Sequence, residues 1–106
     1  MQYRIEYTET AERELEQAYL WILEQSRSLQ IAHNRFNGIT QAIDSLNGLP
    51  ERCGFAPEND YCAEDIRQLL YGQRHGQYRV LFTLREKTVV ILHIRHSARK
   101  HLNSEA

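Results

Sequence analysis

The sequence predicts an α+β domain in which a helical hairpin packs on one face of an antiparallel sheet. One short segment of alternating apolar and polar residues opens the chain, and two longer segments with helical apolar spacing follow it. Three strand-like segments come next on short connections, which favours antiparallel pairing between them. At 106 residues the chain suits one two-layer domain, so we expect a single domain over residues 1–106 with the order β-α-α-β-β-β-(α).

The N-terminal half predicts one strand and two helices. Tyr3, Ile5 and Tyr7 alternate with charged residues, which is typical of a half-buried strand. Thr8 is a suitable N-cap for a helix over residues 9–26. The apolar stripe of this helix is Ala11, Leu15, Ala18 and Ile22, and that of a second helix over residues 29–47 is Ala32, Phe36, Ile39, Ile43 and Leu46. We expect Gly48 to end the second helix in the left-handed conformation.

The rest of the chain predicts a loop, three strands and a terminal helix. Residues 50–65 hold both prolines and five acidic residues, so we expect a long loop there. A strand begins near Ile66, and two more span residues 78–85 and 89–95. Ser97 is a suitable cap for a short C-terminal helix.

The pairing of the last two strands decides which side chains face solvent. A two-residue turn at Glu86 and Lys87 would mix charged and apolar residues on both faces. A three-residue connection, Glu86 to Thr88, separates them, so we expect that connection. One face then holds Tyr78, Val80, Phe82, Leu84, Val90, Leu92 and Ile94 toward the helices. The other face places Arg79 opposite Arg95, Leu81 opposite His93, and Thr83 opposite Ile91.

Charge is distributed unevenly along the chain. Residues 1–66 hold 5 Lys or Arg against 12 Asp or Glu, and residues 67–106 hold 8 against 2, although the net charge is only −1. Two arginines side by side on a strand pair are mildly unfavourable unless an anionic group neutralises them. We therefore predict a partner-binding surface, with a solvated face and intramolecular carboxylate partners as the alternative. Its residues are Arg79, Leu81, Ile91, His93, Arg95 and Arg99.

Several kinds of site have no sequence signature. No spacing of cysteine, histidine and carboxylate residues matches a metal site, and there is no glycine-rich phosphate loop, so we expect neither a metal nor another cofactor. We expect Cys53 and Cys62 to be free thiols, with a disulfide as the alternative. No apolar run is long enough to span a membrane, and the first residues do not resemble a signal peptide, so we expect a cytoplasmic protein.

Several segments taken together resemble one family. The strand YRVLFTL, a polar turn and the ending VVILHIRHSAR are similar to the C-terminal part of the RelE/ParE superfamily of bacterial type II toxins. The opening YRIEYTETAERELEQAYLWI resembles the first strand and helix of that superfamily, and IRQLL resembles its second strand. The resemblance covers nearly the whole chain in the same element order. The segment HSAR is also similar to the H-G-x-R ending that is frequent in the ParE-like branch.

The resemblance implies the toxin of a toxin–antitoxin system, which a cognate antitoxin neutralises by wrapping its surface. ParE-like members inhibit DNA gyrase, whereas RelE-like members cut messenger RNA on the ribosome. Our first hypothesis is therefore a gyrase inhibitor without catalysis, which would cause growth arrest and plasmid stabilisation. The alternatives are a metal-independent, ribosome-dependent endoribonuclease and a non-toxic antitoxin-binding domain of the same fold. The antitoxin is expected to carry an acidic, partly disordered tail that places carboxylates on the arginines.

The nuclease alternative would assign roles to particular residues. The resemblance matches Arg79 to a basic position of the nucleases, so Arg79, Arg95 and Arg99 would hold phosphate. The base would be His93, His96 or His101, because arginine stays protonated while imidazole titrates near neutral pH. Asn103 stands where RelE-like members place a C-terminal tyrosine, and a net charge of −1 is low for a protein that enters a ribosome. Both observations favour the gyrase hypothesis.

Overall fold

The order of elements confirms the predicted α+β class. The computed structural model describes residues 2–72 and 77–96. Its helices and strands are β1 (Arg4–Tyr7), α1 (Glu9–Ser26), α2 (Leu29–Asp44), β2 (Arg67–Tyr71), β3 (Tyr78–Arg85) and β4 (Thr88–His96). Three short 3-10 helices connect α2 to β2, namely η1 (Ser45–Asn47), η2 (Pro50–Arg52) and η3 (Pro57–Tyr61). The terminal helix predicted from Ser97 lies outside the described residues.

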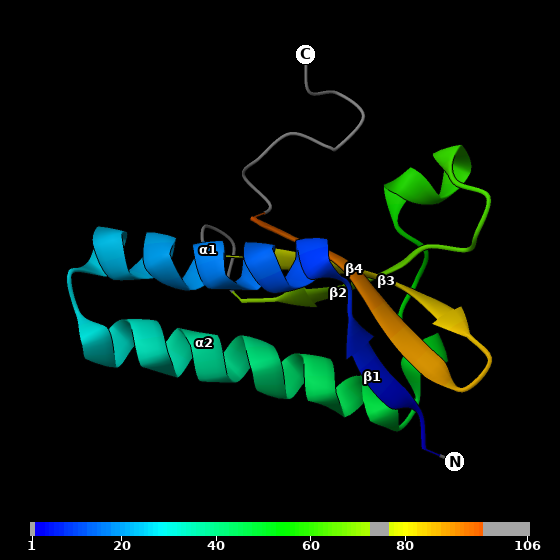
Figure 1. Ribbon diagram of the computed structural model, residues 1–106, viewed down its shortest axis with the longest axis horizontal. Helices are drawn as coiled ribbons and strands as arrows, with labels where there is room; N and C mark the ends of the chain where they lie inside the picture. The colour runs from blue at the N-terminus through cyan, green and yellow to red at the C-terminus, as the bar shows by residue number, and fades with distance from the viewer. Residues whose placement is uncertain (1, 73–76, 97–106) are drawn as a thin grey trace.

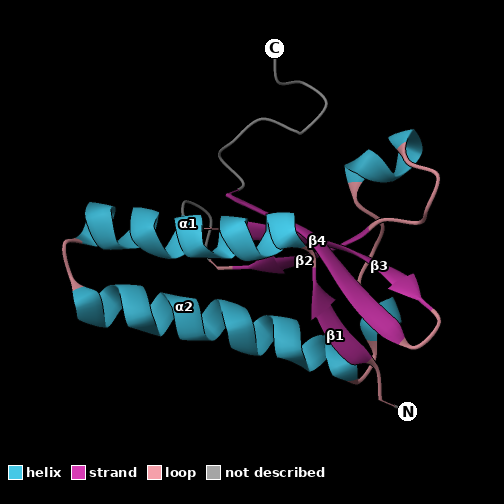
Figure 2. Ribbon diagram, in the orientation of Figure 1, coloured by secondary structure: helices cyan, strands magenta, loops and turns pink. Residues whose placement is uncertain are grey.

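The four strands form one mixed sheet in the order β1-β4-β3-β2. β2, β3 and β4 pair antiparallel as predicted, whereas β1 runs parallel to β4. Parallel pairing needs a long crossover, and the whole segment between β1 and β4 supplies it. Figures 1 and 2 show α1 and α2 side by side as a hairpin, with the segment that contains η3 set apart from this hairpin. Within the described residues, no helix is both long enough and apolar enough to cross a membrane.

Local capping explains where the helices begin and end. The Thr8 hydroxyl accepts a hydrogen bond from the Ala11 N–H (3.1 Å) and donates one to the Ile91 carbonyl (2.9 Å), so it fixes α1 to β4. Arg27 ends α1 in the left-handed conformation (φ 54°), and Ser28 caps α2 at once. Gly48 has φ −89°, so the expected left-handed end of the second helix is wrong. α2 instead ends at Asp44 and continues into η1.

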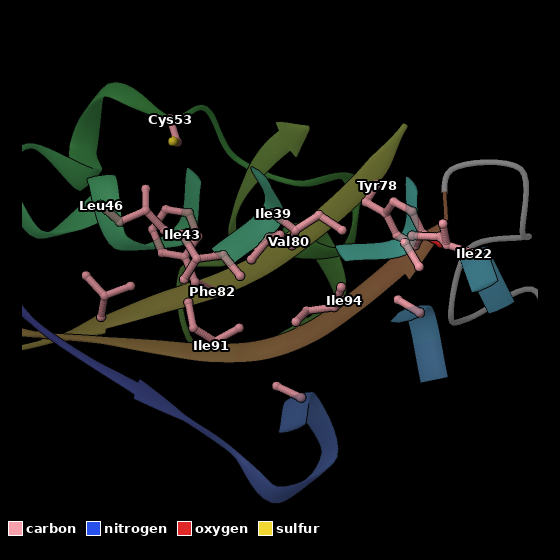
Figure 3. Packing of buried hydrophobic residues seen from close by; sticks show 14 residues of the cluster. Ile22, Ile39, Ile43, Leu46, Cys53, Tyr78, Val80, Phe82, Ile91 and Ile94 are labelled. Atoms are coloured by element: carbon pink, nitrogen blue, oxygen red, sulfur yellow. The ribbon is translucent and has the colours of Figure 1, made fainter. Parts of the chain in front are cut away.

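The main core lies between the helical hairpin and the sheet. Figure 3 shows Ile22 of α1 and Ile39 and Ile43 of α2 packed against side chains of β3 and β4. The buried members of this cluster on the two strands are Tyr78, Val80, Phe82, Val89, Ile91 and Ile94. The predicted helical stripes therefore point into the core except for Phe36, which is not part of this cluster, and every inward residue predicted on β3 also packs there.

The β3–β4 connection differs from the prediction. Arg85 pairs with Thr88, so the turn has two residues, Glu86 and Lys87, and Glu86 has the positive φ (56°) that tight hairpin turns require. The register then shifts by one residue, because Phe82 lies opposite Ile91 while Leu81 lies opposite His93. The extra residue on β4 between these pairs is a β-bulge.

The two-residue turn reverses the predicted faces of Val90, Ile91 and Leu92, and the bulge at Leu92 restores the predicted faces from His93 onward. Val89 and Ile91 enter the main core, whereas Val90 lies opposite Thr83 on the outer face of the sheet. Leu92 packs on the outer face beside Leu81. The expected outward position of Ile91 is therefore wrong, as are the expected inward positions of Val90 and Leu92. The predicted pairs of Arg79 with Arg95 and of Leu81 with His93 are confirmed.

The chain itself covers part of the outer face. Leu81 and Leu92 pack there against Ala56 and Ile66, which flank η3. Hydrogen bonds attach this segment at several points, from the Ala56 N–H to the Ile66 carbonyl (2.8 Å) and from the Thr83 hydroxyl to the Asp65 carbonyl (2.8 Å). The region expected to be a loop therefore forms a second, smaller layer on the sheet.

The bulge can be tested by deletion. Removing Leu92 would bring Ile91 and His93 next to each other without changing any strand pair on either side. We expect the deletion to lower the free energy of unfolding by about 1–3 kcal/mol, similar to Leu92→Ala, since the main loss in both is a partly buried side chain. The deletion also removes the Leu92 carbonyl, which accepts a hydrogen bond from the Thr8 hydroxyl at 3.3 Å, whereas Leu92→Ala keeps it. Urea unfolding followed by circular dichroism measures both variants. A deletion that prevents folding while Leu92→Ala folds would show that the bulge itself is required.

Candidate functional site

Arg79, the centre of the predicted cationic surface, is buried and paired. Only 8% of the residue is exposed, and its Nη2 donates to Oε1 of Glu58 at 2.6 Å. Its Nε donates to Oε1 of Gln68 at 3.1 Å. The expectation that Arg79 lies on an open surface is therefore wrong, and the alternative of an intramolecular carboxylate partner applies to it.

The η3 segment delivers Glu58 to this position. Pro57 begins η3, and Asn59 accepts a hydrogen bond from the Ile66 N–H at 2.7 Å, which closes the segment over the sheet. Glu58 is 5% exposed. A charged pair at 2.6 Å with so little exposure is held by a strong, charge-assisted hydrogen bond. The positive charge of Arg79 is thus neutralised by an acidic residue of the same chain.

The apolar residues of the predicted surface are also covered. Leu81 is buried beneath Ala56 and Ile66 on the outer face. Ile91 is buried on the opposite face, in the core under the helices. An apolar cover over this face was expected from a partner, and for Leu81 the chain's own η3 segment provides it.

His93 and Arg95 lie beside a carboxylate of α1. Oε1 of Glu14 accepts hydrogen bonds from the Ile94 N–H at 2.9 Å and from Nδ1 of His93 at 3.3 Å. Burial alone would raise the pKa of the Glu14 carboxyl, but these hydrogen bonds and the charges of His93 and Arg95 lower it below its usual value. β1 pairs with β4 only as far as Ile91. Beyond that point, Glu14 accepts a hydrogen bond from a backbone N–H of β4 in place of a neighbouring strand.

His96 lies in an aromatic group at the end of β4. Its ring centroid is 5.2 Å from that of Trp21 and 5.0 Å from that of Tyr78. It is separate from His93, which faces Glu14 and a small cavity near Thr8 and Thr10. The two described histidines among the three alternative bases, His93 and His96, therefore lie in different surroundings. Arg99 and His101 lie outside the described residues.

Other predicted features concern metals and cysteines. Among residues 2–72 and 77–96, no group of three or more histidine, cysteine or acidic residues is placed to hold a metal ion. Cys53 and Cys62 are both free thiols. Burial raises the pKa of the Cys53 thiol, although Arg52 and Arg67 oppose this effect.

A groove between the two helices was not predicted from the sequence. It has a volume of about 710 Å³ and lies where Tyr19 packs edge-on against Phe36 and His33. The residues that line it are Tyr7, Glu12, Leu15, Glu16, Tyr19, His33, Phe36 and Asn37. Near the hairpin connection several large apolar residues are exposed, namely Leu20, Trp21, Leu29 and Ile31. The sequence could have indicated this exposure, because these residues lie off the predicted apolar stripes of the two helices.

Comparisons with known proteins give consistent results. The family described as "ParE toxin of type II toxin-antitoxin system, parDE" matches residues 5–101. The chromosomal ParDE system from P. aeruginosa includes a chain with a similar fold, with a TM-score of 0.72 and 16% identity over 90% of this chain and 96% of that chain. A chain of the RelBE2 toxin–antitoxin complex from Mycobacterium tuberculosis gives 0.59 and 20% identity over 93% and 95%. No curated protein sequence matches significantly.

Removing Arg79 should be costly. We expect Arg79→Ala to lower the free energy of unfolding by about 3–5 kcal/mol, because it leaves the Glu58 carboxylate buried without its cation. The double variant Arg79→Met with Glu58→Leu should cost less than Arg79→Ala, because no buried charge remains. Arg85→Ala is the matched control, since Arg85 pairs with Glu64 in solvent and should cost at most about 1 kcal/mol. Equal losses for Arg79→Ala and Arg85→Ala in urea unfolding would contradict burial of the pair.

The Glu14 contacts predict a pH dependence of stability. Because folding lowers the pKa of Glu14 from 4.5, its ionised form stabilises the fold fully above pH 4.5, and this contribution is lost as the pH falls through the lowered value. Glu14→Gln should remove that part of the acid dependence, whereas Glu16→Gln, an exposed site on the same helix, should retain it. Unfolding free energies of the three proteins from neutral to acidic pH measure this. Parallel curves for wild type and Glu14→Gln would refute it.

Proposed function

Because the chain belongs to the ParE toxin family of type II toxin–antitoxin systems, we propose that it arrests growth by binding DNA gyrase and that a cognate antitoxin neutralises it in the cytoplasm. The observation that carries this proposal is the family match, which extends over residues 5–101 and so includes both long helices, β2, β3 and β4, and all of β1 except Arg4. The finer steps, the gyrase target and the antitoxin contact, follow from the ParE branch rather than from a site with catalytic geometry.

The outer face of the sheet supports a binding mechanism over RNA cleavage. A nuclease without a metal needs cations that contact the phosphate and a base near the 2′-hydroxyl. Arg79, the cation matched to the nucleases, is already neutralised by Glu58 beneath the η3 segment. A phosphate could reach Arg79 only after this segment opened. The buried pair therefore favours a toxin that acts through its surface.

The antitoxin has two exposed features to bind. The apolar side chains near the hairpin connection need a cover, as exposed apolar patches generally do. His93 and Arg95 are only half-buried, so an acidic tail could approach these two residues of the predicted surface. We propose that Arg95, His93 and Arg99 take the tail, whereas Arg79, Leu81 and Ile91 are too buried to contact it without rearrangement.

One observation favours the endoribonuclease as a second candidate. Glu14 accepts a hydrogen bond from Nδ1 of His93, and a carboxylate that orients an imidazole in this way is typical of general-base catalysis. The same contact also serves a structural role at the edge of β4, where Glu14 accepts from the Ile94 N–H. The pair therefore raises the nuclease candidate without displacing the first proposal.

Purified components distinguish the two candidates. We expect the protein to inhibit supercoiling by gyrase and to leave messenger RNA on ribosomes uncut, and cells that express it to induce the response to DNA breaks. The antitoxin complex is the control and should abolish inhibition. Cleavage of messenger RNA that is lost in His93→Gln but kept in His33→Gln, with gyrase unaffected, would overturn the gyrase proposal in favour of the nuclease.

A further inference from the structure

A small pocket lies between α1 and the sheet, at the place where β3 begins and β4 ends. Its volume is about 260 Å³, slightly below the range of about 300–1,000 Å³ that is typical of small-molecule sites. This size suits one long side chain rather than a cofactor or a folded element. The residues that line it are Glu14, Gln17, Ala18, Trp21, Tyr78, Ile94 and His96.

Three aromatic rings form the walls of this pocket. The rings of Tyr78 and His96 meet at 90°, and those of Trp21 and His96 at 50°, so the three rings stand at steep angles to one another. Tyr78 is 3% exposed and so is fixed by the core, whereas Trp21 is 42% exposed. Part of the Trp21 ring is therefore accessible to a ligand beside the fixed ring of Tyr78.

A carboxylate completes the lining. Glu14 also lines the pocket, and its carboxyl is held in the ionised form by His93 and the Ile94 N–H. Both of these donors are closest to Oε1, and Oε2 is 3.5 Å from Nδ1 of His93. Arg95 is the nearby cation that also acts on Glu14, so a ligand would share this carboxylate with it.

We propose that this pocket binds the cationic head of an arginine or lysine side chain. Aromatic faces attract guanidinium and ammonium groups, most strongly where the cation is partly desolvated, and tryptophan is the most effective ring. The carboxylate of Glu14 adds a charge-assisted partner at the wall. The cation can come from a partner protein or from Arg99 and Lys100 of this chain, which follow His96 in the sequence and lie outside the described residues. The proposal does not depend on which target the toxin has.

Binding to the pocket can be measured by the fluorescence of Trp21. Trp21 is the one tryptophan in the sequence, so intrinsic fluorescence of the full-length protein reports on this pocket. Titration with N-acetylarginine amide at pH 8, where imidazole is largely neutral, should give a saturable change. N-acetylcitrulline amide has nearly the same shape without the charge and should bind at least about fivefold more weakly.

Matched variants locate the effect. Glu14→Gln should weaken binding of the arginine probe about threefold or more, whereas Glu16→Gln, which faces the other groove, should leave it unchanged. Gln17→Glu adds a carboxylate at an exposed lining position and should tighten binding without affecting the core. Because Gln17→Glu is a gain of affinity, it remains informative if Glu14→Gln folds poorly.

A further variant identifies the source of the cation. If Arg99→Gln with Lys100→Gln raises the affinity for the probe, the chain's own segment is the occupant, and if affinity is unchanged a partner supplies it. The proposal is overturned if neither this variant nor the wild type shows saturable binding. It is also overturned if the citrulline probe binds as well as the arginine probe, or if Gln17→Glu has no effect.

Discussion

The β-bulge at Leu92 is the constraint on which both faces of the sheet depend. It lies between two blocks of strand pairs, and each block alone is regular. With the extra residue, the first half of β4 directs Val89 and Ile91 to the helices, and the second half directs Ile94 there. If Leu92 were instead paired as a regular strand residue, one half of β4 would turn apolar side chains outward and charged ones inward, since a shift of one residue exchanges the faces of a strand.

The fold also pairs acidic and basic residues that are unevenly distributed along the chain. The acidic first part of the sequence supplies partners for the basic second part. Glu58 pairs with Arg79 in the interior, Glu64 pairs with Arg85 in solvent, and Glu14 contacts His93. Removing one partner should lower the free energy of unfolding most for the Glu58–Arg79 pair, because exposed ion pairs contribute little and a buried charge without its partner is costly.

Because Arg79 is neutralised within the chain, the surfaces relevant to function lie more on the helices than on the outer face of the sheet. The outer sheet face is closed at Arg79 by the η3 segment, whereas α1 presents features on both of its sides. One side faces the groove shared with α2, and the other side contributes Trp21 and Glu14 to the aromatic pocket at the end of β4. α1 therefore connects the core, the edge of β4 and the exposed surfaces that a protein partner would meet.

The sequence by itself determined the element order and most of the helical stripes, because periodicity and capping depend on residues that are close along the chain. The pairing of Arg79 with Arg95 was predicted from a three-residue connection, and it holds because the two-residue turn and the bulge offset each other. The sequence also contained the resemblance to the toxin family. Only the tertiary structure decided the two-residue turn and the bulge, since a three-residue connection gave an equally regular pattern of apolar residues. It likewise decided that Glu58 neutralises Arg79 and that Glu14 reaches β4. These contacts join residues 21 and 80 positions apart, and among five acidic residues in one loop no local rule selects the one that the fold buries.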